Sequence, residues 1–457
     1  MKKKDLRSKE WFDNPKDPGL TALYLERYLN YGLKREDLQS GKPIIGIAQS
    51  GSDLSPCNRH FQALSNVIKD GIREAGGVPM EFPTHPIQET GKRPTAGLDR
   101  NLSYLSLVEV LYGYPIDGVI LTTGCDKTTP AALMAAATVN IPSIVLSGGP
   151  MLDGTYKGKK AGSGTIIWEA RRLHAKGEIS YEEFMDMAAA SAPSIGHCNT
   201  MGTASSMNSI AEALGMSLTG GAIIPAPYKE RESISFKTGK RIVEMVHEDL
   251  TPSKIMTKKA FENAIYVASA IGASSNCPPH LTAIARHMGI DFGIDNWEKL
   301  GHDIPLLVNC QPAGEHLMEG FFKAGGIPAI MQELMKNNKL HKDLMTVTGK
   351  TIAENLIEKI NIDENIIKSF KNPLVNNAGF IVMKSNFFNS AVMKTSVISS
   401  EFRKRYLSNP ECLNLFEANA VVFEGPEDYH LRINDERLNV NENSILMIRG
   451  CGPVGYP

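Results

Sequence analysis

Three cysteines lie in polar loops, where a thiol can bind a metal instead of packing in a core. Cys57 lies in SDLSPCNRH, Cys125 in TTGCDKTTP and Cys198 in SIGHCNTMGTA. A cysteine that only fills space more often lies within an apolar run. Because roughly 70 residues separate each cysteine from the next, they do not form a local zinc motif. A shared site would have to be assembled by the fold, and three unrelated thiols are the alternative.

The highest concentration of reactive side chains lies in residues 124–130, GCDKTTP. A soft thiolate, a hard carboxylate and an amine stand side by side where a strand is expected to turn into a helix. The same spacing is typical of an ordinary helix start, with Thr128 or Thr129 as the cap, Pro130 in the first turn and a solvated Asp-Lys pair. The G-x-x-x-x-G-K-[ST] spacing of a phosphate-binding loop is absent. A match to G-x-G-x-x-G at residues 450–455 is weak alone, and we reject a dinucleotide site there.

The other four cysteines carry weaker signals. Cys310 and Cys412 are expected to be small core residues, Cys277 is expected to be a packing or pocket-lining thiol, and Cys451 has no assignable role. Seven cysteines without dense spacing indicate thiols or metal ligands in a reducing compartment rather than a disulfide framework. His197, beside one of the loop cysteines, is expected to be a hydrogen-bonding partner rather than a base.

Alternating strands and helices must position the first two loops. Gly76-Gly77 ends the first long helix, because glycine tolerates the left-handed conformation at that point. The alternation predicts a parallel sheet with right-handed crossovers. Ligands in such sheets gather at the carboxyl ends of the strands, so loops from different crossovers can meet there. Buried strands are predicted at residues 43–49, 78–82, 117–123 and 141–147, and helices at 60–75 and 131–139.

The middle of the chain reads as mostly helical, from about residue 200 to residue 340. One strand is expected within it, at residues 305–309. The mixed charges of residues 229–249 predict a solvated helix face.

Composition changes after about residue 370, where helical periods give way to short β-like runs separated by Asn, Gly and Pro. These runs lie at residues 379–383, 420–423 and 444–448. We therefore expect an α/β domain over residues 1–370, which carries the chemistry. A β-rich, barrel-like domain that is incomplete is expected over residues 371–457.

The composition is that of an ordinary globular protein and excludes several partner classes. The chain has 457 residues, of which 42% are hydrophobic, and its 49 Lys+Arg balance 50 Asp+Glu to a net charge of -1. This balance gives no general attraction to nucleic acid or to an anionic membrane. No apolar run approaches the roughly 20 residues that span a bilayer, and we expect a cytoplasmic protein.

Four long motifs are jointly specific for one family. They are GCDKTTP at residues 124–130, SGGPML at 147–152, GHCNTMGTASSMNSIAEALGM at 196–216 and RGCGPVGYP at 449–457. Together they resemble the dihydroxy-acid and 6-phosphogluconate dehydratase family, over essentially the whole chain. The resemblance implies an enzyme that removes water from a 2,3-dihydroxy carboxylate to give a 2-keto-3-deoxy acid.

A further segment resembles the sugar-acid branch of that family, which includes the L-arabinonate and D-xylonate dehydratases. It comprises Gln88-Glu89-Thr90, Arg93-Pro94-Thr95-Ala96 and Arg100-Asn101-Leu102. The resemblance implies a pentonate-like small-molecule substrate. The alternative within the family is the dihydroxy-acid dehydratase of branched-chain amino-acid biosynthesis.

The resemblance also implies an iron–sulfur cluster. Cys57, Cys125 and Cys198 match the cysteines that hold it, as a 2Fe-2S cluster in the sugar-acid branch, with 4Fe-4S as the other possibility. Three ligands leave one iron with an open position, where it can act as a Lewis acid on a hydroxyl.

Magnesium is the second implied cofactor, and Glu89, Asp126 and Lys127 match its ligands. The lysine is carried as its carbamate, which supplies the hard oxygen that Mg²⁺ prefers. Magnesium would orient the substrate carboxylate and 2-hydroxyl and stabilise the charge that builds as the C2 proton leaves. The open iron would take the 3-hydroxyl as the leaving group.

The family pattern also extends beyond the last residue of this sequence. In the family, the segment after GYP brings another glutamate to magnesium, and a later loop brings the serine assigned as the base. Because the sequence stops at Pro457, the catalytic base is unknown, and we expect a fragment of a longer enzyme. A catalytically inactive, metal-binding fragment is the alternative, and the resemblance implies homodimers or homotetramers.

Overall fold

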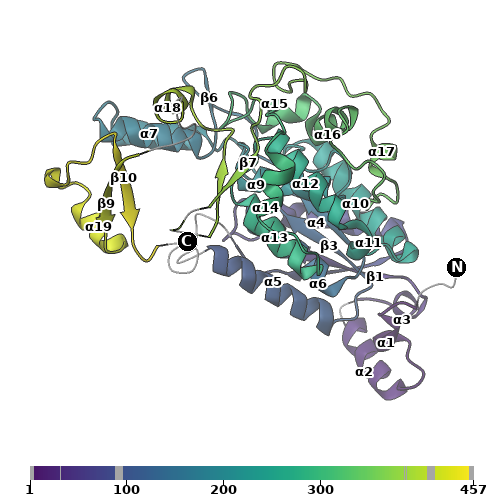
Figure 1. Cartoon of the computed structure of the whole chain (residues 1–457). Helices are drawn as coiled ribbons and strands as arrows, with labels where there is room; N and C mark the ends of the chain where they lie inside the picture. Colours follow the sequence, from purple (N-terminus) through teal and green to yellow (C-terminus); the bar gives the residue numbers. More distant parts are fainter. Residues whose placement is uncertain are drawn as a thin grey trace.

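The computed structural model has a four-stranded parallel sheet at its centre (Figure 1). The strands follow the order β2-β1-β3-β4, and each pairs with its neighbour in parallel. The four predicted strands are confirmed to within two residues at β1 Ile44–Gln49, β2 Val78–Pro83, β3 Gly118–Thr123 and β4 Ser143–Ser147. The structure describes residues 5–30, 32–87, 96–384, 386, 389–408 and 417–451.

The burial of these strands explains why their sequences are almost continuously apolar. Every residue of β1, β3 and β4 is buried, whereas β2 at the edge of the sheet is only partly buried. A parallel sheet is covered by helices on both faces, so its inner strands have no polar face. The predicted α/β class and parallel sheet are confirmed.

Helices α4 (Phe61–Glu74) and α10 (Lys229–Glu248) cover one face of the sheet, and α5 (Ala96–Gly113) and α6 (Thr128–Val139) cover the other (Figure 1). Helices α4 and α10 cross at glycines. A Cβ atom on Gly71 would lie 2.2 Å from the Phe236 carbonyl oxygen, and one on Gly239 would lie 2.4 Å from that of Ile68. Gly76 has φ +84°, the left-handed conformation predicted after α4.

The solvated face predicted for residues 229–249 is confirmed, but Arg231 does not belong to it, because the opposite face of the helix is buried. Arg231, Thr238 and Ile242 are buried, while Glu232 and Lys237 between them are exposed. The mixed charges concealed this buried face in the sequence pattern. The small residues of the face allow α10 to lie close against α4. A guanidinium group was thereby drawn into the core.

A second set of helices packs beside α6, with α9 at its centre. Every residue of α9 is buried, so its polar side chains must find partners inside the protein. The expected strand at 305–309 was wrong, since only isolated bridges pair Leu306 with Val375 and Val308 with Ile367. The partner segments are irregular and offer no continuous edge. These helices are α9 Thr203–Ala213, α12 Lys258–Ala270, α13 Cys277–His287 and α16 Gly326–Lys336.

The C-terminal region contains small sheets at all three predicted runs. Strands β7 (Phe380–Met383) and β8 (Ala391–Lys394) pair antiparallel, and β9 (Asn419–Phe423) and β10 (Ser444–Ile448) pair in parallel. The β9–β10 pair lies to one side of the main body (Figure 1). A closed barrel and the domain boundary at residue 370 stay predictions. Short helices accompany these strands at α18 Ser400–Tyr406, α19 Pro426–Arg432 and the 3₁₀ turn Glu436–Leu438.

The remaining elements are mostly short, and those within residues 154–190 form a separate, small apolar cluster. Among the described residues, none of the helices combines the length and the apolar composition that crossing a membrane requires. These elements are α1 Lys9–Phe12, α2 Pro18–Leu29, α3 Arg35–Gln39, β5 Gly154–Tyr156, β6 Lys159–Ala161, α7 Thr165–Ala175, α8 Tyr181–Ala190, α11 Pro252–Ile255, α14 Asp295–Gly301, α15 Met318–Lys323 and α17 Ile352–Asn355.

Candidate functional site

The cysteine loops meet at the carboxyl edge of the sheet. Cys57 lies between β1 and α4, and Cys125 lies two residues after the end of β3. The pKa of the Cys57 thiol is raised by a hydrogen bond with the Cys125 side chain, then by burial and by the charges of Cys125, Cys198 and Asp126. These interactions require the groups to be neighbours. The structure therefore brings together three thiols that lie far apart in the sequence, while their role as ligands stays a prediction.

Asp126 and Lys127 form a buried ion pair where α6 begins. Lys127 Nζ lies 2.6 Å from Asp126 Oδ2, and the two side chains are only 10% and 2% exposed. A solvated pair, the ordinary alternative for this motif, is therefore excluded. Withdrawing two charges from water costs several kcal/mol per ion, which an attraction between them only partly repays. A buried pair beside three thiols indicates a functional arrangement more than a stabilising one.

The start of α6 also differs from the expected cap. Lys127 occupies the N-cap position, and its side chain makes no capping hydrogen bond. Thr128 instead bonds backward into the loop, because its Oγ1 accepts from the Gly124 N–H (3.1 Å) and donates to the Cys125 carbonyl (2.8 Å). The threonine predicted as a cap thus fixes the cysteine loop.

The donor set fits the two metal groups that the family resemblance implies. Thiols suit iron–sulfur clusters, and a carboxylate beside a modifiable amine suits a hard cation. Within the described ranges, no three His, Cys, Asp or Glu side chains are grouped so that they could hold a single ion. A two-iron cluster spreads three thiolates over two metal atoms, so this arrangement is compatible with one. Glu89, the third predicted magnesium ligand, lies outside the described residues.

His197 is a buried hydrogen-bonding partner, as the sequence predicted. Its Nδ1 lies 3.0 Å from the Cys198 carbonyl oxygen, and since a carbonyl only accepts, Nδ1 must carry the proton. Burial lowers the pKa of His197 to about 3. The ring is therefore neutral at ordinary pH and orients the backbone of a predicted ligand.

An Arg100–His280 pair lies near Lys127 and was not predicted. Arg100 Nη1 lies 2.9 Å from His280 Nδ1, and because arginine only donates, His280 must carry its proton on Nε2. That Nε2 is buried and has no hydrogen-bond partner in the described structure. Burial lowers the pKa of His280 to about 3, with contributions from the charges of Lys127 and Arg100. The sequence does not predict this pair, because no local pattern connects His280 to Arg100, which lies 180 residues away.

The other described cysteines differ from one another in burial. Cys277 is completely buried, and burial raises the pKa of its thiol to about 12. Cys310 is also buried, as predicted for a packing residue, whereas Cys451 is exposed. Cys412 lies outside the described residues.

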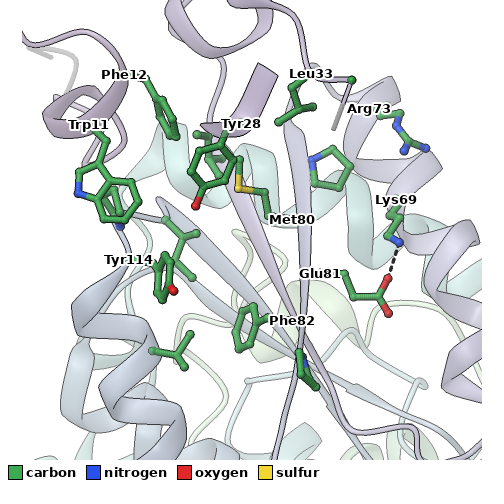
Figure 2. Close-up of a pocket in the computed structure, with 17 residues that line it drawn as sticks. Trp11, Phe12, Tyr28, Leu33, Lys69, Arg73, Met80, Glu81, Phe82 and Tyr114 are labelled. Atoms are coloured by element: carbon green, nitrogen blue, oxygen red, sulfur yellow. Dashed lines mark ion pairs between the residues drawn. The ribbon is translucent and has the colours of Figure 1, made fainter. Parts of the chain in front are cut away.

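A large cavity lies elsewhere, along the outer edge of β2. It has a volume of about 900 Å³. Figure 2 shows Trp11, Tyr28, Phe82 and Tyr114 around it, with the Lys69–Glu81 ion pair at one side. Of the predicted site residues that the structure describes, none lines it. Ligands of open α/β sheets bind at the carboxyl ends of the strands, so we place the candidate site at the cysteine loops rather than in this larger space.

Two family models together cover most of the chain. Residues 42–355 match the dihydroxy-acid/6-phosphogluconate dehydratase N-terminal model, and residues 365–457 match the corresponding C-terminal model.

Individual relatives match nearly the full chain. A D-xylonate dehydratase of Caulobacter vibrioides is 60% identical over 451 residues, which is 99% of this chain and 76% of the relative. An L-arabinonate dehydratase of Rhizobium leguminosarum bv. trifolii is 43% identical over 100% of this chain and 78% of its own length. A dihydroxy-acid dehydratase of Acetivibrio thermocellus is 35% identical over 93% of this chain and 75% of its own.

Proposed function

Because this chain belongs to the dihydroxy-acid/6-phosphogluconate dehydratase family, we propose that it is a hydro-lyase that dehydrates a sugar acid to a 2-keto-3-deoxy acid. The observation that carries the proposal is the 60% identity to a D-xylonate dehydratase over 99% of the chain. The three neighbouring thiols and the buried ion pair at the carboxyl edge of the sheet support it independently.

D-xylonate is the proposed substrate, with L-arabinonate second. Identity falls from 60% for the D-xylonate dehydratase to 43% for an L-arabinonate dehydratase and 35% for a dihydroxy-acid dehydratase. This order favours a pentonate over the branched-chain precursor of amino-acid biosynthesis. The two pentonates differ only in hydroxyl stereochemistry, which a site distinguishes through oriented polar groups.

Cys57, Cys125 and Cys198 are proposed to hold an iron–sulfur cluster, 2Fe-2S in preference to 4Fe-4S. Asp126 and Lys127, the latter as its carbamate, are proposed to hold Mg²⁺ with Glu89. When bound, these groups would supply Lewis acidity toward the departing hydroxyl and the substrate carboxylate. The adjacency of Cys125 and Asp126 supports placing both chemistries in one site.

The protein's own groups would position the substrate between these two sets of ligands. His280 presents a buried Nε2–H near Lys127, and Arg100 fixes the ring from its other side. Such a donor, already desolvated and oriented, can bind a substrate oxygen without further reorganisation. The reaction removes a proton from C2 and hydroxide from C3, and the enol that results tautomerises to the 2-keto acid with release of one water.

The experiment that tests the proposal is an assay of the anaerobically purified protein with three substrates. D-xylonate, L-arabinonate and 2,3-dihydroxy-isovalerate are each supplied with Mg²⁺, and the 2-keto acid product is measured. We expect kcat/KM to be highest for D-xylonate. Faster turnover of 2,3-dihydroxy-isovalerate than of either pentonate would overturn the substrate class.

The inactive metal-binding alternative gives a different result in the same assay. It predicts bound iron without turnover of any of the three acids. Light scattering on the same sample tests the further proposal that the protein forms homodimers or homotetramers, because a monomer at assay concentration would contradict it.

A further inference from the structure

Three buried side chains satisfy the backbone of the Cys125 loop. Loops usually leave peptide groups to water, but the Gly124–Cys125 peptide groups are bonded inside the protein. Thr128 Oγ1 accepts a hydrogen bond from the Gly124 N–H and donates one to the Cys125 carbonyl. The other two groups, the Cys125 N–H and the Gly124 carbonyl, bond to the asparagines Asn58 and Asn208.

Asn58 links the Cys57 loop to the Cys125 loop. It directly follows Cys57 and is completely buried. Its Oδ1 accepts from the Cys125 N–H at 3.0 Å, and its Nδ2 donates to Ser50 Oγ at 3.1 Å. Ser50 Oγ in turn lies 3.0 Å from Thr122 Oγ1 on β3. A single amide thus connects the residue next to one thiol with the backbone of another.

Asn208 joins the same loop to α9, which begins five residues after Cys198. Its Nδ2 donates to the carbonyls of Gly124 (3.1 Å) and Ala204 (2.9 Å). Its Oδ1 accepts from the hydroxyls of Thr123 (2.9 Å) and Thr129 (3.1 Å), at the end of β3 and the start of α6. All four hydrogen-bonding positions of the amide are therefore used.

The network continues from Asn208 to the third cysteine. His197 Nε2 lies 3.4 Å from Asn208 Nδ2 and shares one of the two amide hydrogens that are already donated to carbonyls, and His197 Nδ1 donates to the Cys198 carbonyl. The backbones of all three cysteine loops are thereby connected through two asparagines and one neutral histidine. Networks in which every member is satisfied are rigid, because no group can leave without exposing a buried partner.

We propose that Asn58 and Asn208 are positioning residues that hold the three thiols in place before metal binds. The inference rests on the proposed function, since it takes an iron–sulfur cluster to be the group that the thiols hold. It goes further by assigning the geometry of the site to two side chains that do not touch the cluster. Partners of this kind typically change metal affinity about 10- to 100-fold when they are replaced.

Asn208→Asp is the first test, with Asn263→Asp as the matched control. Aspartate keeps the size of the side chain but points an oxygen at two carbonyls that needed a donor. Asn263 is also completely buried, and both ends of its amide bond the backbone of His341 (Nδ2 to the carbonyl, 2.9 Å; Oδ1 from the N–H, 2.8 Å). The control therefore imposes a comparable loss of stability away from the thiols.

The measurements are iron and acid-labile sulfide per chain, the visible and electron paramagnetic resonance spectra, and the rate of iron loss to a chelator. We expect Asn208→Asp to lose iron about 10- to 100-fold faster than wild type, with an altered spectrum. Asn263→Asp should match wild type in all three, even where its thermal midpoint falls equally.

Asn58 allows a conservative rescue. Asn58→Ala removes the acceptor of the Cys125 N–H and should also lose iron faster. Asn58→Asp keeps that acceptor, and Ser50 Oγ can turn to donate to the new oxygen, so we expect iron retention to return toward wild type.

The outcomes separate this inference from the proposed function. If the wild-type protein acquires no cluster on anaerobic reconstitution, the proposed metal chemistry fails. If wild type loads normally but Asn208→Asp and Asn263→Asp retain iron equally, the positioning role is wrong and the amides only stabilise the fold.

Discussion

The carboxyl edge of the sheet and the cavity beside β2 each contain an ion pair, but the two pairs differ in how deeply they are buried. The Asp126–Lys127 pair has side chains that are 2% and 10% exposed, whereas those of Glu81 and Lys69 are 26% and 24% exposed. The first pair lies among thiols and hydrogen-bonded amides, and the second lies at the side of an aromatic space of about 900 Å³ (Figure 2).

This difference teaches that the larger space is not the better candidate for chemistry. The aromatic side chains around the cavity are mostly apolar and need few polar partners. Polar groups without access to water must be fully bonded or they destabilise the fold. The buried Asp126–Lys127 pair at the carboxyl edge is therefore the feature whose retention needs a functional reason. Variants of this edge can be compared with variants at the cavity.

The largest effect is expected from Cys125→Ser. The variant removes a proposed cluster ligand, so dehydratase activity should fall by more than about 100-fold, beyond the loss typical of replacing an outer partner. Iron per chain should fall with it. The control is Cys310→Ser, which replaces an equally buried packing thiol whose Sγ lies 3.7 Å from the Leu317 carbonyl. Equal iron content in the two variants would contradict the assignment of Cys125.

A second prediction compares the two ion pairs directly. In metal-free protein without bicarbonate, Asp126→Asn leaves the Lys127 amine buried and unpaired, which should lower the free energy of unfolding by about 3–5 kcal/mol. Lys69→Met at the cavity breaks a partly exposed pair and should change it by at most about 1 kcal/mol. Urea unfolding measures both. Similar values for the two variants would remove the contrast between the regions.

Gly124→Ala should disturb the cysteine loop without adding charge. Its Cβ would lie 2.3 Å from Asn58 Oδ1, so the amide must move away from the Cys125 N–H. We expect iron loss to a chelator to become about 10-fold faster. Gly293→Ala is the control, because its Cβ would meet no atom within 4 Å. Unchanged retention in Gly124→Ala would show that the loop tolerates displacement.

The smallest effect is expected for the contribution of Glu81, beside the cavity, to stability in acid. Burial opposes ionisation of Glu81, but hydrogen bonds from Lys69, Ser65 and Gln49 outweigh it and hold the pKa below 4.5. Because the pKa of Glu81 is lower in the folded state than in the unfolded state, its ionised form stabilises the fold at pH values above the unfolded pKa. This stabilisation is lost as the pH falls through the folded pKa. Stability should therefore decline below about pH 4.5, and less steeply in Glu81→Gln. Identical acid unfolding of both proteins would contradict this pKa shift.

Local sequence signals found most of the sheet, because a buried parallel strand must be apolar along its whole length. β1 and β3 follow this rule, and the glycine after α4 has the left-handed conformation predicted for it. The same signals failed for Arg231, which reads as a surface charge. It is buried because its Nη atoms donate to the carbonyls of Ser147, Gly221 and Ile224, partners that helical periodicity cannot identify.

The site divides in the same way. The sequence by itself determined which residues carry reactive chemistry, since thiols, carboxylate and amine are visible as residue types in polar loops. Only the tertiary structure decided that Cys57 lies beside Cys125, that Asp126 and Lys127 are buried, and that Asn58 and Asn208 connect their loops. The physical reason is that residue type and periodicity are local, whereas burial and hydrogen-bond partners are set by segments that pack from far along the chain.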